Sequence, residues 1–209
     1  MKSIRMQDLS PMQLDALREI GNMGAGNAAT AFSTLLNKRI DMTVPQVALL
    51  PFNEVPDAMG GAESLVAGVY LEMTGGAPGK ILFILPSASA LVLVDMLTGS
   101  VHEEGAMDLS EMDQSALMEI GNILTGAYLN SLSAFTGLTL LPSVPALAYD
   151  MVGALLNEVL IDLGEVDDYA LIIETEFYES TETVKGHFFF IPSPGSLQII
   201  LDRLGVSNL

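Results

Sequence analysis

One eight-residue segment occurs twice in this chain of 209 residues, in the same register in each half. The first copy reads Asp15-Ala-Leu-Arg-Glu-Ile-Gly-Asn22, and the second reads Ser115-Ala-Leu-Met-Glu-Ile-Gly-Asn122. A proline follows both copies after the same interval, Pro45 in the first half and Pro145 in the second. A repeat of this kind indicates a duplicated structural unit, so we expect two similar halves joined in one fold.

Each half predicts the same order of elements: a capped helix, a strand interrupted by proline, a β-hairpin and a closing helix. In the first half the elements are expected over residues 10–37, 40–50, 64–74 with 79–85, and 87–97. In the second half they are expected over residues 110–136, 138–147, 169–178 with 184–191, and 196–204. An additional short helix is expected over about 149–158.

Three strands in each half are too few for a stable sheet, so the two halves are expected to share one. The predicted fold class is α/β of the α+β type, with a pseudo-two-fold internal duplication. It contains one six-stranded, mainly antiparallel sheet, two long helices that carry the repeated segment, and additional shorter helices. We therefore expect one domain over residues 1–209, built from repeats at about 1–100 and 108–209 with an acidic linker at about 101–107.

The repeated segment places its polar residues on one side of a helix. At about 100° per residue, positions 15, 19 and 22 fall within a wedge of roughly 60°. Leucines and glycines occupy the other side and are expected to pack on the sheet. The outward-facing residues are therefore predicted to be Asp15, Glu19 and Asn22 in the first half, and Ser115, Glu119 and Asn122 in the second.

A plain solvated helix face is the alternative interpretation of these polar residues. Two observations favour a function: asparagine is a mediocre residue in the middle of a helix, and neighbours such as Arg18 and Met118 differ between the copies. However, the whole Glu-Ile-Gly-Asn block is shared, so packing of the repeat could account for part of the similarity. The sequence leaves both contributions open.

Two further patterns have simpler interpretations. The glycines at Gly21, Gly24 and Gly26 resemble a phosphate-binding loop, but no Lys-Ser/Thr ending follows and no strand precedes, which favours close helix packing. The acidic residues of the hairpins invite comparison with metal ligands, although alternating strand faces and turns explain them better. These residues are Glu72, Glu174, Glu176, Glu179 and Glu182.

Composition excludes several classes of partner. The chain has 8 Lys and Arg against 26 Asp and Glu, a formal charge of −18, which disfavours nucleic acid and anionic membrane surfaces. It has no cysteine and only two histidines, so a zinc site of the His/Cys kind is not expected, and the absence of cysteine suits a reducing compartment. No signal peptide or membrane span is evident, and we expect a cytoplasmic protein.

The spacing Asp/Ser-x3-Glu-x2-Asn-x22-Pro resembles the signature of the CheC/CheX/FliY family of chemotaxis phosphatases. All signature positions match in both halves, and the resemblance extends over essentially the whole chain. Two complete signatures are typical of the CheC branch. CheX is expected to carry one functional signature, and FliY an additional C-terminal domain.

The resemblance implies hydrolysis of the aspartyl phosphate of the response regulator CheY. It implies that Asn22 and Asn122 orient the attacking water and that Glu19 and Glu119 pair with a lysine of CheY. Asp15 and Ser115 are implied as supporting contacts, and Pro45 and Pro145 as structural residues. No cofactor of the chain's own is expected, because the regulator supplies Mg²⁺.

The resemblance also implies a second partner, the receptor deamidase CheD. The predicted helix over 149–158 is the expected docking element, with Asp150 as an exposed contact, although such a helix could equally cap the core. Two alternatives to the phosphatase remain: a non-catalytic adaptor for CheD and a component of the flagellar switch.

Overall fold

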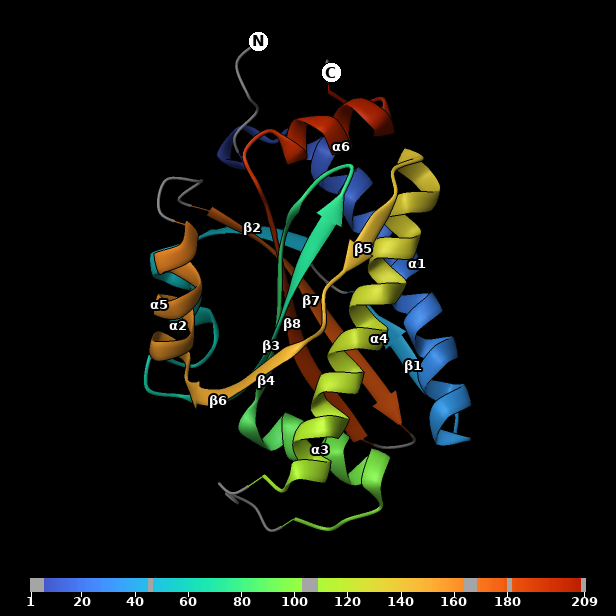
Figure 1. Cartoon of the computed structure of the whole chain (residues 1–209), viewed down its shortest axis with the longest axis vertical. Coiled ribbons are helices and arrows are strands. Elements are labelled where there is room, and N and C mark those ends of the chain that lie inside the picture. The colour runs from blue at the N-terminus through green and yellow to red at the C-terminus, as the bar shows by residue number, and fades with distance from the viewer. Residues whose placement is uncertain (1–5, 45–46, 103–108, 164–168, 180–181, 208–209) are drawn as a thin grey trace.

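A single antiparallel sheet forms the centre of the computed structural model shown in Figure 1, which describes residues 6–44, 47–102, 109–163, 169–179 and 182–207. The strands run in the order β1-β7-β8-β4-β3-β5, with β2 also paired to β7 and β6 also paired to β3. They are β1 (Asp41–Thr43), β2 (Val47–Pro51), β3 (Leu65–Gly75), β4 (Gly79–Pro86), β5 (Leu140–Pro142), β6 (Ala146–Met151), β7 (Tyr169–Glu179) and β8 (Glu182–Pro192).

Helices cover both faces of this sheet. They are η1 (Met6–Asp8), α1 (Pro11–Leu36), η2 (Phe52–Glu54), α2 (Val55–Ala58), α3 (Ser87–Thr98), α4 (Glu111–Thr136), α5 (Val152–Leu163) and α6 (Ser196–Leu204). The long helices α1 and α4 lie together on one side and run in opposite directions, whereas α2 and α5 lie on the other side (Figure 1). None of the described helices combines the length and hydropathy needed to cross a bilayer.

The sheet has eight strands where the sequence predicted six, because each proline-interrupted strand is divided in two. The segment expected over 40–50 forms β1 and β2, and the one expected over 138–147 forms β5 and β6. Pro145 lies in the irregular stretch between β5 and β6, whereas Pro45 falls outside the described residues. A proline has no N–H to donate to a neighbouring strand, which accounts for the break at Pro145.

The two halves exchange strands across the sheet. Strands β1 and β2 of the first half pair with β7 of the second, and β5 and β6 of the second half pair with β3 of the first. The hairpins meet in the middle, where β4 pairs with β8. The expectation that both halves build one sheet is confirmed, and the outer strands interlock them.

Alternating side chains along the central strands divide the core into two layers. Ile81 and Phe83 of β4 face the cluster under α1 and α4, whereas Leu82 and Ile84 face the cluster under α5. Because successive residues of a strand point to opposite faces, a continuous apolar run fits a strand covered on both sides. The hairpin and closing-helix predictions are confirmed to within a few residues.

The short helix differs from its prediction. It begins at Val152 rather than near residue 149, and Asp150 belongs to β6, where it pairs with Val66 of β3. Leu155 and Leu156 are buried against the sheet, so the inner side of α5 caps the second core layer. The structure also contains η2 and α2 in the stretch where the sequence analysis expected no helix.

Candidate functional site on the paired helices

Both long helices begin with a capping box. The Ser10 N–H donates to Gln13 Oε1 (2.8 Å), and the Gln13 N–H donates back to Ser10 Oγ (3.4 Å). In α4 the Ser110 N–H donates to Asp113 Oδ2 (2.9 Å), and the Asp113 N–H donates to Ser110 Oγ (3.2 Å). Each reciprocal pair satisfies N–H groups that have no partner within the helix, which fixes where the helix starts.

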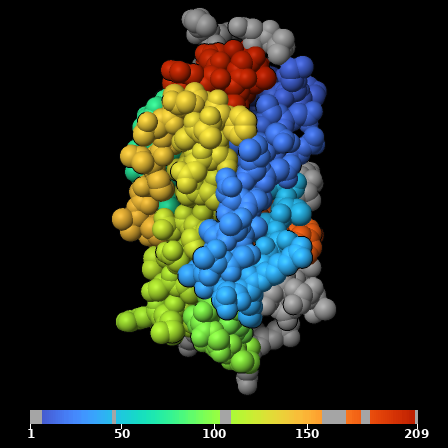
Figure 2. Space-filling model, turned by 90° about the vertical axis from the view of Figure 1, so that its right-hand side faces the viewer, coloured from blue at the N-terminus to red at the C-terminus, as the bar shows by residue number. Residues whose placement is uncertain are grey.

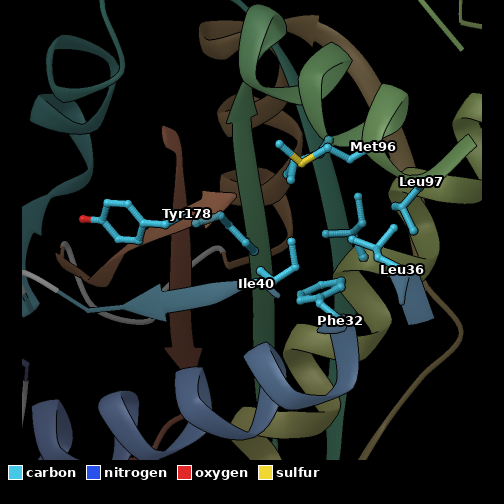
Figure 3. A pocket seen from close by; sticks show the side chains of 9 residues that line it. Phe32, Leu36, Ile40, Met96, Leu97 and Tyr178 are labelled. Atoms are coloured by element: carbon cyan, nitrogen blue, oxygen red, sulfur yellow. The ribbon is translucent and has the colours of Figure 1, made fainter. Parts of the chain in front are cut away.

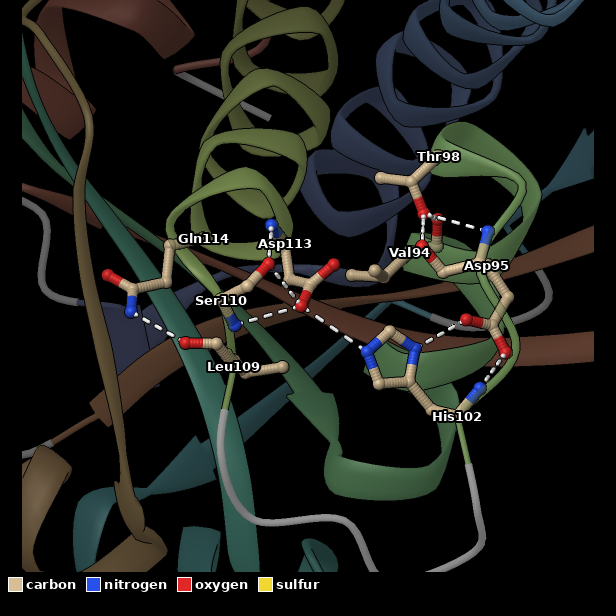
Figure 4. A network of polar contacts seen from close by, with 9 residues as sticks. Val94, Asp95, Thr98, His102, Leu109, Ser110, Asp113 and Gln114 are labelled. Carbon is tan, nitrogen blue, oxygen red and sulfur yellow. Dashed lines mark hydrogen bonds and ion pairs between the residues drawn. The ribbon is translucent and has the colours of Figure 1, made fainter.

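The same capping residues anchor both helices to the segments that follow the closing helices. Gln13 Nε2 donates to the Val206 carbonyl (2.9 Å), just beyond α6. At the other end, His102 lies between Asp113 of α4 (Nε2 to Oδ2, 3.3 Å) and Asp95 of α3 (Nδ1 to Oδ1, 2.5 Å), as Figure 4 shows. Gln13 and Asp113 are both buried, so these contacts hold the helix starts in place.

Small residues bring the helices close to each other and to the sheet. A Cβ built on Gly24 of α1 would lie 2.4 Å from Tyr128 of α4, and one on Gly121 would lie 2.5 Å from Val69 of β3. Nearby, Asn27 Nδ2 donates to Ser131 Oγ across the pair (3.1 Å). Close packing of the two helices therefore explains Gly24, as the sequence suggested. The same prediction is wrong for Gly26, where a Cβ would meet nothing within 4 Å, and Gly21 and Gly121 face the sheet rather than the other helix.

The first signature lies on the outer side of α1. Leu17, Ile20 and Gly21 are buried, whereas Glu19 and Asn22 are exposed, as is Asp15. Figure 2 shows α1 extending along the surface beside α4. The predicted division into an apolar inner side and a polar outer side is confirmed.

The second signature has nearly the same placement on α4. Ser115 and Glu119 are exposed, while Asn122 is half-buried. Because α1 and α4 run in opposite directions and each signature lies in the N-terminal half of its helix, the two signatures occupy opposite ends of the pair (Figure 1). We call these exposed sides the signature faces: residues 15, 19 and 22 on α1, and residues 115, 119 and 122 on α4.

The glutamate and asparagine of each signature face are free to meet a partner. Within the part of the chain that the structure describes, Glu19, Asn22, Glu119 and Asn122 form no side-chain hydrogen bond or ion pair. Asp15 differs, because its carboxylate pairs with Arg18 one turn away (2.8 Å). The amides offer both donors and an acceptor, and the carboxylates offer a charge.

Two acidic residues of the second hairpin, Glu174 and Glu176, are used internally, whereas the side chains of Glu179 and Glu182 lie outside the part that the structure describes. Lys185 contacts Glu176 (2.8 Å) and Glu174 (3.8 Å), and the hydrogen bond from Lys185 holds the pKa of Glu176 below its usual value. Among the described residues no three His, Asp or Glu side chains cluster as metal ligands do. Strand-face pairing therefore describes Glu174 and Glu176 better than a metal site.

An apolar crevice lies between the C-terminal end of α1, helix α3, the inner side of α4 at Ile120 and the sheet (Figure 3). Its lining includes Phe32, Leu36, Ile40, Met96 and Leu97. Its volume is about 20 Å³, roughly what one water molecule needs. This crevice is a feature of packing and too small for a metabolite.

The remaining predicted residues are dispersed. Asp150 is exposed and accepts a hydrogen bond from the N–H of Met151 (2.7 Å), and its partner Val66 on β3 belongs to the core layer under α5. Pro145 is half-buried, in keeping with a structural position. The sequence analysis missed the contacts of His102, and nothing in its sequence context indicated that its two carboxylate partners would come together.

Comparison with known proteins gives a consistent result. The model of the CheC-like family matches residues 12–49 and 112–149, the two signature helices with the strand that follows each. The chain is 41% identical over 199 residues to the CheY-P phosphatase CheC of Bacillus subtilis, covering 93% of this chain and 95% of that protein.

Two solved structures share the fold. FliY of Thermotoga maritima superposes with a TM-score of 0.76 at 24% identity and covers 96% of this chain and 99% of that one. A chain of the CheX–CheY–BeF3–Mg²⁺ complex from Borrelia burgdorferi gives a TM-score of 0.51 at 18% identity, covering 81% of this chain and 96% of that one. Given the close sequence relative and the duplicated signature, the chain belongs to the CheC-like family.

Proposed function

We propose that this protein hydrolyses the aspartyl phosphate of a CheY-type response regulator, using the signature faces of α1 and α4 as two separate sites. The observation that carries the proposal is that a Glu–Asn pair without internal partners recurs on the outer side of both helices, with Glu19, Asn22 and Glu119 exposed and Asn122 half-buried. The relative at 41% identity is a CheY-P phosphatase, and a structurally similar chain belongs to a solved complex of CheX with CheY.

Hydrolysis of an aspartyl phosphate requires little of the phosphatase beyond positioning the attacking water. An acyl phosphate is already activated: water adds to phosphorus as the bond to the aspartyl oxygen breaks, which gives inorganic phosphate and a free carboxylate. Mg²⁺ held by the regulator neutralises charge on the phosphoryl oxygens. What remains is to hold water in line with phosphorus, and catalysis of this kind depends on position and electrostatics.

Asn22 and Asn122 have the proposed role of orienting that water. A carboxamide can accept a hydrogen bond from water and donate one to a phosphoryl oxygen, and it does not titrate near neutral pH. Glu19 and Glu119 have the proposed role of pairing with a lysine of the regulator, one turn before each amide. Asp15 and Ser115 have supporting positions at the start of each face.

The double variant Asn22→Ala/Asn122→Ala tests this assignment. We expect its stimulation of phosphate release from phosphorylated CheY to fall by about 10²-fold or more, as when one positioned polar group is lost. Circular dichroism should stay unchanged and the unfolding midpoint should not fall, because both side chains lack internal partners and alanine is the better helix former. Asn157→Ala is the matched control: this amide is exposed on α5, on the opposite side of the sheet, and its loss should leave the rate intact.

CheD is the second partner that we propose, at the exposed end of β6. Asp150 and Met151 are exposed side by side there, and Met151 is 44% accessible. Asp150→Arg should then abolish co-purification with CheD while phosphate release from CheY continues at the wild-type rate. If this variant still binds CheD as the wild type does, Asp150 is not part of the CheD contact.

A further inference from the structure

Gly26 and Gly126 are glycines that the fold itself does not require. Of the glycines that the structure describes, these two alone combine a backbone outside the left-handed region with open space, where a Cβ would meet nothing within 4 Å. Both lie in the interior of a 26-residue helix, Gly26 in α1 and Gly126 in α4. There, glycine is less favourable than alanine by about 1 kcal/mol.

The repeat singles out the same two positions. After the shared asparagine, residues 23–31 and 123–131 agree at one position only, the glycine. The neighbours differ completely: Gly24 is matched by Leu124, and Asn27 by Ala127. Two helices that diverge after the shared asparagine thus keep a residue that weakens both of them and that no internal contact explains.

Their place relative to the signature residues suggests a reason. Gly26 follows Asn22 by four residues, and Gly126 follows Asn122 by the same interval, so each glycine lies on its signature face about 6 Å further along the helix axis. Asparagine is a short side chain. For its amide to enter another protein's pocket, the helix backbone itself must come close to the rim of that pocket, and a side chain one turn away would hold it off.

Exposed methionines at the other end of each face support contact with a protein. Met12 is 53% exposed and Met112 is 67% exposed, at equivalent positions one turn before Asp15 and Ser115. Methionine adapts to varied apolar surfaces, and recurrent exposure of a large apolar side chain beside a polar site is typical of a protein–protein contact.

We infer that Gly26 and Gly126 are close-approach positions, where the main chain of the response regulator beside its phosphorylated aspartate packs directly against the helix backbone. This inference rests on the proposed function, since it uses the same partner and the same faces. It assigns the two glycines a positioning role: they set how deeply Asn22 and Asn122 can reach.

Replacing the two glycines by alanine should stabilise the fold but weaken binding to CheY, and replacing them by glutamine should weaken binding further. We expect Gly26→Ala/Gly126→Ala to raise Tm by about 2–4 °C per site, because alanine is the better helix former. The same variant should raise Kd for CheY carrying beryllofluoride about tenfold, and Gly26→Gln/Gly126→Gln about 10²-fold, as steric overpacking does. kcat/KM for phosphate release should fall by the same factors. Ala31→Gln, which adds comparable bulk to an exposed position on another side of α1, should change neither Kd nor kcat/KM.

Two results would overturn the inference. One is a glutamine double variant that binds beryllofluoride-loaded CheY as tightly as the wild type. The other is a lowered Tm in the alanine variant, which would show that the fold requires the glycines.

The asparagine variants separate this inference from the proposed function. If Asn22→Ala/Asn122→Ala loses activity while the glycine variants keep their Kd, only the inference fails. If the asparagine variant keeps its rate while the glycine variants lose affinity, the catalytic assignment fails and the close approach stands.

Discussion

Equivalent residues of the two repeats have different surroundings, and Gly21 and Gly121 are the clearest pair. Both occur in the shared Glu-Ile-Gly-Asn block, on the buried side of their helices. A Cβ on Gly21 would meet Ile173 at 3.6 Å, an ordinary contact, whereas a Cβ on Gly121 would lie 2.5 Å from Val69. The second helix therefore approaches the sheet more closely than the first at this position.

This difference predicts opposite effects of one substitution. Gly121→Ala should lower the free energy of unfolding by about 1–3 kcal/mol through overpacking against Val69. Gly21→Ala should be neutral or stabilise by up to about 1 kcal/mol, because the methyl group fits and alanine favours the helix. Urea unfolding of the two variants beside the wild type measures both, and equal losses of stability would show that the two helices lie equally close to the sheet.

At the level of elements, the start of α4 is held by a polar clasp centred on His102, whereas the start of α1 has the hydrogen bond from Gln13 to Val206. His102 joins Asp95 at the end of α3 to Asp113 in the capping box of α4. The hydrogen bond with Asp95 raises the pKa of His102 above its ordinary value of 6.5, and the hydrogen bond from the Ser110 hydroxyl lowers the pKa of Asp113 below 3.8. Both shifts favour the charged forms in the folded protein.

The clasp predicts a pH-dependent contribution to stability. A raised pKa in the folded state means that the contribution of His102 is complete below pH 6.5 and is lost as the pH rises through the raised pKa. The stability deficit of His102→Ala relative to the wild type should therefore be larger at about pH 5.5 than at about pH 9. Urea unfolding at both pH values gives the comparison, and an equal deficit at both would mean that His102 acts through packing alone.

The sequence predicted the helices and strands better than the contacts between them. The capped helices, the hairpins and the outward Glu–Asn pairs follow from periodicity and from Ser10 and Ser110, which are local signals. Pro145 likewise marks the interruption between β5 and β6 locally, but the later start of α5 depends on the pairing of β6 with β3, a partner distant in the sequence. The clasp at His102 likewise depends on tertiary packing between α3 and α4, which no local pattern encodes.

For the whole molecule, strand exchange makes each half depend on the other. If the first repeat is produced alone, β1 and β2 lose their partner β7. If the second is produced alone, β5 and β6 lose their partner β3. The helix starts are shared in the same way, through the contacts of Gln13 with Val206 and of Asp113 with His102. We therefore expect the two repeats to fold as one cooperative unit.

Cooperative unfolding of the full chain checks this expectation. Far-ultraviolet circular dichroism and tyrosine fluorescence should report the same urea midpoint, since a two-state transition gives coincident curves. A fragment of residues 1–100 should not fold as a monomer. Two separated transitions in the full chain, or a cooperatively folded monomeric fragment, would show that the halves are independent.

The most direct measurement of the central claim is the rate of phosphate release from phosphorylated CheY with Asn22→Ala, Asn122→Ala and the double variant, at equal protein concentration. Because the two signature faces lie at opposite ends of the helix pair, the rates added by the two single variants should sum to the rate added by the wild type. The double variant should leave only the intrinsic decay of the aspartyl phosphate. A double variant that works as fast as the wild type would contradict the assignment of catalysis to these two amides.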